Sequence, residues 1–104
     1  MTATDVTAAA PVTPAAARLL HARGEIERID RELIGLIAER VRIAREVGVA
    51  KTELGIPTLD PAREAAVVRR AGELARELGL GDEDVRYIFW HLIGLSRRAQ
   101  MEVG

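Results

Sequence analysis

Two cationic residues fall on the predicted apolar face of a long helix, where an aliphatic side chain is expected. Arg40 stands seven residues after Leu33 and seven before Val47, which belong to that apolar face. Lys51 follows Arg40 by eleven residues, which on a helix is a rotation of about 20° and a rise of about 16 Å. Two cations on one face can converge on an anion between them. They can also extend past an interface into water or pair with structural glutamates.

Further polar residues cluster where the next helix is predicted to begin. Asp60, Arg63 and Glu64 fall within one turn, which brings two carboxylates and a guanidinium together. Acidic residues at this place also cap a helix and complement its dipole, so capping and solvation are the alternative explanation. Toward the C-terminus, Ser96 and Gln100 continue an apolar helix face with two neutral hydrogen-bonding groups. A hydrogen-bonded polar pair at an interface is the commoner explanation of two such residues.

Arg23 precedes Arg40 by seventeen residues, about 25 Å along a helix and rotated by roughly 100°. Within one chain it therefore cannot reach the same small ligand. In a two-fold dimer of antiparallel long helices, Arg23 of the partner subunit can enter the site from the other end. A single exposed arginine near a helix start is otherwise an ordinary surface residue.

Three helices are predicted to position these residues. An uninterrupted helical pattern from about Arg18 to Leu54 ends at Gly55, a residue suited to a left-handed C-terminal cap. Asp60 and the proline after it form an N-cap and first turn for a second helix that stops at Gly79. A third helix begins at Gly81-Asp82. The predicted fold class is all-α, with one long helix and two shorter ones.

Domain organisation and assembly follow from the lengths of these elements. We expect residues 1–17 to be a flexible N-terminal tail and residues 18–104 to form one domain. The first helix should be about 55 Å long and the other two about 28 Å each. A hairpin of two short helices cannot cover the whole apolar face of the long one. We therefore expect a second copy to cover the remainder in an intertwined helical homodimer.

Composition excludes several classes of function. Fifteen Lys+Arg against sixteen Asp+Glu give a formal net charge of −1, so the chain lacks the positive field of a nucleic-acid binder. It has no cysteine, and His21 and His91 lie seventy residues apart, so no metal site is expected. No run approaches the roughly 18 apolar residues of a membrane span. The first seventeen residues lack the cations of a targeting signal, and we expect a cytoplasmic protein.

The ordered set of polar residues resembles the type II, all-helical chorismate mutases. The resemblance covers about Leu19 to Gln100 and includes the segments IERIDRELIGLIAERVRIAREVGVAK and DPAREAAVV. It implies an isomerase of the shikimate pathway that rearranges chorismate to prephenate. This reaction is the committed step toward phenylalanine and tyrosine. The resemblance implies no cofactor and no metal, and a homodimer whose active sites are shared between chains.

The same resemblance implies a role for each matching position. Arg40 and Arg23 of the partner subunit would grip the two carboxylates of chorismate. Lys51 and Gln100 would hydrogen-bond the ether oxygen whose bond to carbon breaks. A planar guanidinium binds a carboxylate through two hydrogen bonds whereas an ammonium is a compact charge, so arginine and lysine suit these different tasks.

The other matching positions surround the substrate ring. By resemblance, Glu64 meets the ring hydroxyl, Arg63 orients the cluster, and Asp60 and Ser96 contribute to the pocket wall and to substrate binding. Because the rearrangement occurs within one molecule, it needs no nucleophile and no proton relay. The protein must supply a compact substrate conformer and fixed positive charge beside the ether oxygen.

Two other functions remain open. Isochorismate pyruvate lyases share this fold and the cationic residues, and Glu64 favours the mutase because the lyases resemble this chain less at that position. A non-catalytic helical dimerisation module that partners a shikimate-pathway enzyme would explain the apolar faces. It would not explain why Arg40 and Lys51 stand within one of them.

Overall fold

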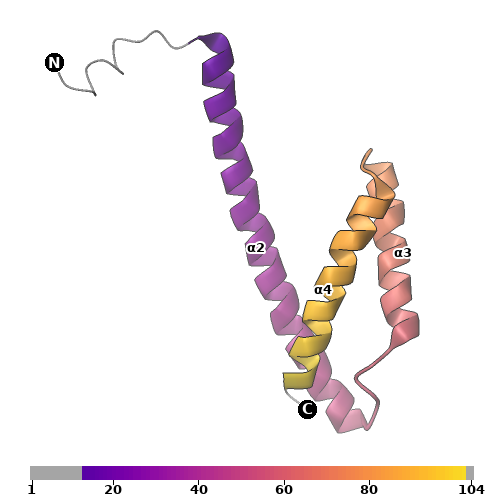
Figure 1. The fold of residues 1–104 in the computed structure, drawn as a ribbon. Helices are drawn as coiled ribbons and strands as arrows, with labels where there is room; N and C mark the ends of the chain where they lie inside the picture. Colours follow the sequence, from indigo (N-terminus) through magenta and orange to yellow (C-terminus); the bar gives the residue numbers. More distant parts are fainter. Residues whose placement is uncertain (1–12, 103–104) are drawn as a thin grey trace, which may run out of the picture. The chain divides into compact units, whose positions relative to one another are not determined.

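The computed structural model describes residues 13–102, and within that range it consists of α-helices joined by short connections (Figure 1). Helix α2 spans Pro14–Leu54, α3 spans Pro61–Glu77 and α4 spans Asp82–Glu102. The predicted all-α class with one long and two shorter helices is therefore confirmed. The chain divides into two compact units, Met1–Gly35 and Leu36–Gly104. Most of the expected tail, residues 1–12, lies outside the described residues.

Helix α2 begins four residues before the start predicted near Arg18, so that expected start was wrong. The Thr13 hydroxyl accepts a hydrogen bond from the backbone N–H of Ala16 at 3.0 Å, which is the geometry of an N-cap. Pro14 occupies the first helical position, where its missing N–H costs nothing. Alanines follow, which favour a helix without contributing to an apolar stripe. Periodicity therefore gave no signal at these positions.

The predicted boundaries between the helices are confirmed by their caps. Gly55 has a φ of 68°, and after it the backbone N–H of Ile56 donates to the Lys51 carbonyl at 2.9 Å. Asp60 caps α3. Gly79 has a φ of 75°, and the Leu80 N–H donates to the Ala75 carbonyl at 2.8 Å. Both glycines occupy the left-handed region, in which a side chain is strained.

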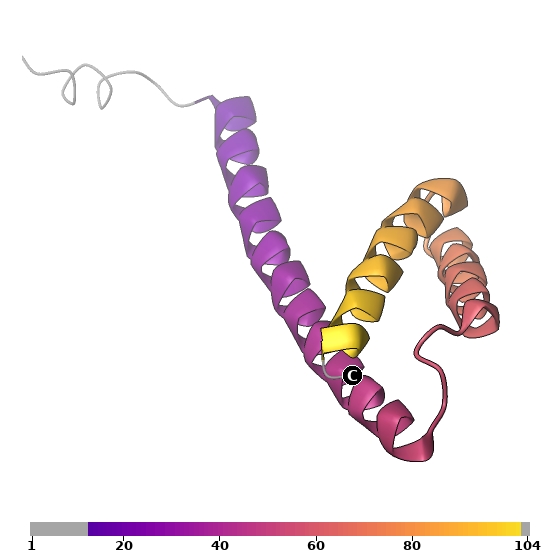
Figure 2. The same cartoon turned by 60° about the horizontal axis from the view of Figure 1, so that its bottom comes forward.

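Helices α3 and α4 lie side by side as a hairpin (Figure 2). Their buried positions are mostly small: Val68, Ala71, Gly72, Ala75, Ile93, Ser96 and Ala99. A Cβ placed on Gly72 would come within 2.6 Å of Nε in the Arg86 side chain, so that side chain would have to move to admit it. The larger apolar residues Leu74, Leu78 and Ile88 of these helices are exposed in the single chain.

The turn between α3 and α4 yields a stability prediction. Gly79→Ala places a Cβ in the left-handed region and should lower the free energy of unfolding by about 1–2 kcal/mol. Gly79→Asn should lose less, because asparagine tolerates that conformation better. Urea unfolding of both variants at one protein concentration measures the difference. An alanine variant as stable as the wild type, or an asparagine variant less stable than the alanine one, would contradict this account of the turn.

Candidate active site

A cavity of ≈ 400 Å³ lies within the unit Leu36–Gly104, between side chains of α2, α3 and α4. This volume suits a small organic ligand. Aliphatic residues form much of its wall: Ile43, Ala44, Val47, Val67 and Ile93. Seven residues singled out in the sequence also line it: Arg40, Lys51, Asp60, Arg63, Glu64, Ser96 and Gln100. Arg23, the eighth, is an exposed residue of α2 in the other compact unit, Met1–Gly35.

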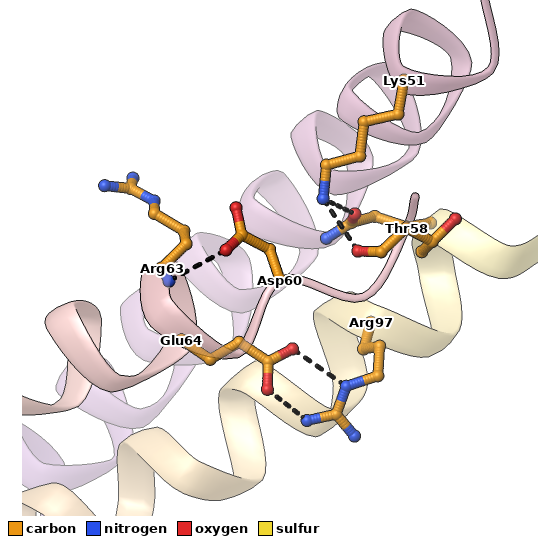
Figure 3. A network of polar contacts seen from close by, with 7 residues as sticks. Lys51, Thr58, Asp60, Arg63, Glu64 and Arg97 are labelled. Carbon is orange, nitrogen blue, oxygen red and sulfur yellow. Dashed lines mark hydrogen bonds and ion pairs between the residues drawn. The ribbon is translucent and has the colours of Figure 1, made fainter. Parts of the chain in front are cut away.

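Lys51, in the last turn of α2, is the only lysine of the chain. Its Nζ donates to the Thr58 carbonyl at 2.9 Å and to Oε1 of Gln100 at 2.8 Å (Figure 3). An ammonium has three N–H donors, so one is left after these two bonds. Because lysine can only donate, Gln100 must turn its oxygen toward Lys51, and its NH₂ group remains a donor. Thr58, in the connection before α3, carried no signal in the sequence because its backbone oxygen makes the contact.

Arg40 reaches α4 from the middle of α2. Its guanidinium donates to the hydroxyl of Ser96, which is buried. Arginine carries five N–H donors in a rigid plane, so one bond to a hydroxyl fixes the direction of the group and leaves others to bind an anion. Ala44 and Gly48, one and two turns further along α2, are buried small residues.

Glu64 belongs to the first turn of α3 and is held by a residue that the sequence reasoning missed. Arg97 of α4 donates from Nε to Oε2 of Glu64 at 2.9 Å and from Nη2 to Oε1 at 2.6 Å (Figure 3). The hydrogen bonds from Arg97 lower the pKa of the Glu64 carboxyl below its ordinary value. Pairing with Glu64 in turn raises the pKa of Arg97. Glu64 is therefore an anion that accepts hydrogen bonds at neutral pH.

Asp60 and Arg63 are both exposed residues at the rim of the cavity. Oδ1 of Asp60 accepts a hydrogen bond from the backbone N–H of Arg63 at 3.1 Å, so Asp60 caps α3 as well as lining the cavity. Among residues 13–102, no hydrogen bond or ion pair is found for the guanidinium of Arg63. In Figure 3 it extends away from the Glu64 carboxylate.

The arrangement suits a small anion that also accepts hydrogen bonds. Arg40 and Lys51 are bound to neutral oxygens rather than to carboxylates, so neither charge is cancelled by an ion pair. Within residues 13–102, no group of three or more metal-ligating side chains is found. None of the described helices combines the length and apolar character needed to cross a bilayer.

Comparison with known proteins places the chain in a family. The family model described as chorismate mutase type II matches residues 22–101. A chorismate mutase of Methanocaldococcus jannaschii is 34% identical over 82% of this chain and 86% of its own length. A T-protein of Enterobacter agglomerans is 34% identical over 85% of this chain, which corresponds to 24% of that longer protein.

A solved structure has a similar fold. A conserved hypothetical protein from Pyrococcus furiosus superposes with a TM-score of 0.66 at 36% sequence identity, over 80% of this chain and 95% of that one. The family match covers every cavity residue described above as well as Arg23. The chain therefore belongs to the chorismate mutase type II family.

Proposed function

We propose that this chain catalyses the intramolecular rearrangement of chorismate to prephenate in the cavity between its three helices. The observation that carries the proposal is the pair Lys51 and Gln100, which hold each other at 2.8 Å and leave an N–H donor on each. Family membership supports the choice of reaction. A rearrangement within one molecule needs positioning and hydrogen-bond donors, and the residues that line the cavity can supply both.

The breaking bond of chorismate joins an ether oxygen to carbon, and the oxygen gains negative charge as the bond stretches. The third N–H of Lys51 and the amide NH₂ of Gln100 are suited to donate to that oxygen. Since both side chains are already fixed by hydrogen bonds, they need little reorganisation when the charge develops. Fixed donors of this kind stabilise a transition state more than they stabilise the ground state.

The substrate's two carboxylates require cations at a separate place. Arg40, directed by Ser96, is suited to bind one of them through two parallel N–H groups. Glu64 is suited to accept a hydrogen bond from the ring hydroxyl, because it is ionised and lines the same cavity. Asp60 and Arg63 complete the rim. Together these contacts would hold the compact conformer in which the two reacting ends of the molecule meet.

The active form is, we propose, a homodimer in which the second carboxylate is bound by Arg23 of the partner subunit. Every described residue from 13 to 36 is exposed, including Ile26 at 57% and Leu33 at 52%. Within residues 13–102, no large hydrophobic side chain is fully buried. Apolar residues exposed over this much of a helix favour burial against a second chain.

The first experiment is the reaction itself. When the purified protein is incubated with chorismate, the absorbance of chorismate should fall as prephenate forms, and the rate should saturate with substrate concentration. Isochorismate should yield little pyruvate. If the protein instead releases pyruvate from isochorismate faster than it converts chorismate, the lyase is favoured. Inertness toward both compounds would refute an enzyme at this cavity and favour a binding module.

Loss of the Lys51 ammonium should mainly lower turnover. We expect Lys51→Ala to reduce kcat by about 10²–10³-fold, the effect of removing one preorganised donor from a site that stabilises developing charge. Lys51→Arg should also lose activity, because a planar fork cannot replace a compact ammonium. Arg70→Ala, an exposed cation of α3 outside the cavity, is the matched control. Near wild-type kcat in Lys51→Ala would remove the residue from the mechanism.

A shared active site can be tested by mixing two inactive chains. Arg23→Ala and Lys51→Ala should each be nearly inactive as homodimers. In their purified heterodimer, one of the two sites combines an intact Arg23 with an intact Lys51, so about half of the wild-type activity per dimer should return. Steady-state assays of differently tagged, co-purified chains give the answer. Recovery of no activity would argue against exchange of Arg23 between subunits.

A further inference from the structure

We infer that Arg97 is a positioning residue for Glu64: by binding both carboxylate oxygens from α4, it fixes the direction in which Glu64 accepts a hydrogen bond from the substrate's ring hydroxyl. This inference rests on the proposed function. Glu64 lines the cavity and Arg97 does not, so Arg97 would act through Glu64 rather than on the substrate.

The two bonds from Arg97 restrict a torsion that is otherwise broad. The last torsion of a glutamate side chain joins sp³ and sp² carbons and has no sharp minima. Bonds from Nε at 2.9 Å and from Nη2 at 2.6 Å hold the carboxylate in the plane of the guanidinium. Two parallel bonds define a plane, whereas a single bond would leave the group free to rotate.

Binding by Arg97 leaves Glu64 able to accept further hydrogen bonds. A carboxylate offers about four lone-pair sites on its two oxygens, and Arg97 takes one on each. The other sites remain for a donor inside the cavity. The pair is also more shielded than the helix-surface pairs: the side chains of Glu64 and Arg97 are 17% and 32% exposed, against 62% and 66% for Arg42 and Glu46. Less competition from water makes the orientation more persistent.

Charges from three elements act on the Glu64 carboxyl. Arg97 on α4 lowers its pKa most strongly, through hydrogen bonds and then through its charge, and Lys51 on α2 lowers it as well. Burial and the neighbouring Asp60 raise the pKa, without reversing the net lowering. Removal of Arg97 should therefore let the pKa of Glu64 rise. Activity that requires the Glu64 carboxylate to be ionised would then be lost on acidification at a higher pH than in the wild type.

A purely structural role is the competing interpretation, since the pair also ties α3 to α4. That role predicts a loss of stability with unchanged kinetics in the folded fraction. The positioning role predicts that Arg97 matters only while Glu64 is an acceptor, which a double-mutant cycle can decide.

The test uses Arg97→Ala, Arg97→Lys and Glu64→Gln in the full chain, with Arg98→Ala as the control, because Arg98 is the exposed neighbour of Arg97. Arg97→Ala should lower kcat/KM about tenfold to 100-fold, as expected for a displaced substrate-positioning group. The acid limb of its pH profile should move to higher pH. Arg97→Lys keeps the charge but loses the two-point geometry, so its acid limb should move to higher pH by less than that of Arg97→Ala, and it should still lose activity.

The double variant decides whether Arg97 acts through Glu64. In the Glu64→Gln background, Arg97→Ala should cause little additional loss of kcat/KM. If the losses instead multiply, or if folded Arg97→Ala and Arg97→Lys have wild-type kinetics and pH profiles, the inference is overturned. Should Arg97→Ala fail to fold, Arg97→Lys with its own double variant provides the same comparison.

A measurement without turnover separates this inference from the proposed function. The Glu64 carboxyl can be titrated by NMR in the wild type and in Arg97→Ala, and its pKa should be higher in the variant. If the wild-type protein does not turn over chorismate, the proposed function is refuted, and so is a catalytic role for the orientation of Glu64 by Arg97. An active wild type whose kinetics and Glu64 titration are unaffected by Arg97→Ala refutes only the inference about Arg97.

Discussion

The ammonium of Lys51 is the point at which the parts of the site meet. It extends from the end of α2, and its two acceptors are a backbone oxygen in the connection to α3 and an amide oxygen near the end of α4. Both acceptors are neutral, so they fix the position of the charge without cancelling it. A carboxylate in either place would orient the lysine equally well but would neutralise the charge that, in the proposed mechanism, stabilises the developing oxyanion. The surrounding helices therefore have to bring neutral oxygens, and no acid, to this atom.

Arg40 repeats the same principle, because the buried hydroxyl of Ser96 directs it without neutralising it. Glu64 shows the opposite case. It is an acid inside the same cavity, and its hydrogen-bonded cation is Arg97, which lies outside the cavity wall, while Lys51 in the wall acts on it only through its charge. This separation lets cations and an acid share one small cavity without collapsing into ion pairs with each other. A ligand that carries a carboxylate and a hydroxyl can then find a partner for each of these groups in the cavity.

Much of this could be predicted from the sequence, for physical reasons that differ between residues. Gly55, Asp60 and Gly79 mark helix ends because backbone conformation and capping are local properties. Arg40 and Lys51 stand out because a charge interrupts an apolar period. The start of α2 at Pro14 was missed because alanines form a helix without a stripe. Arg97 was missed because its partner lies 33 residues away on another helix, and the register between α3 and α4 is set by packing of small residues such as Gly72 and Ala99, which periodicity does not reveal.

The most direct test of the central claim uses the fact that Lys51 is the only lysine of the chain. Protein prepared with isotope-labelled lysine gives one side-chain NMR signal, which reports on this ammonium alone. Titration with a bicyclic dicarboxylic acid that mimics the rearranging substrate should shift that signal to saturation, with one equivalent bound per chain. A mimic that binds while the Lys51 signal stays unchanged, or one that does not bind at all, would contradict the account.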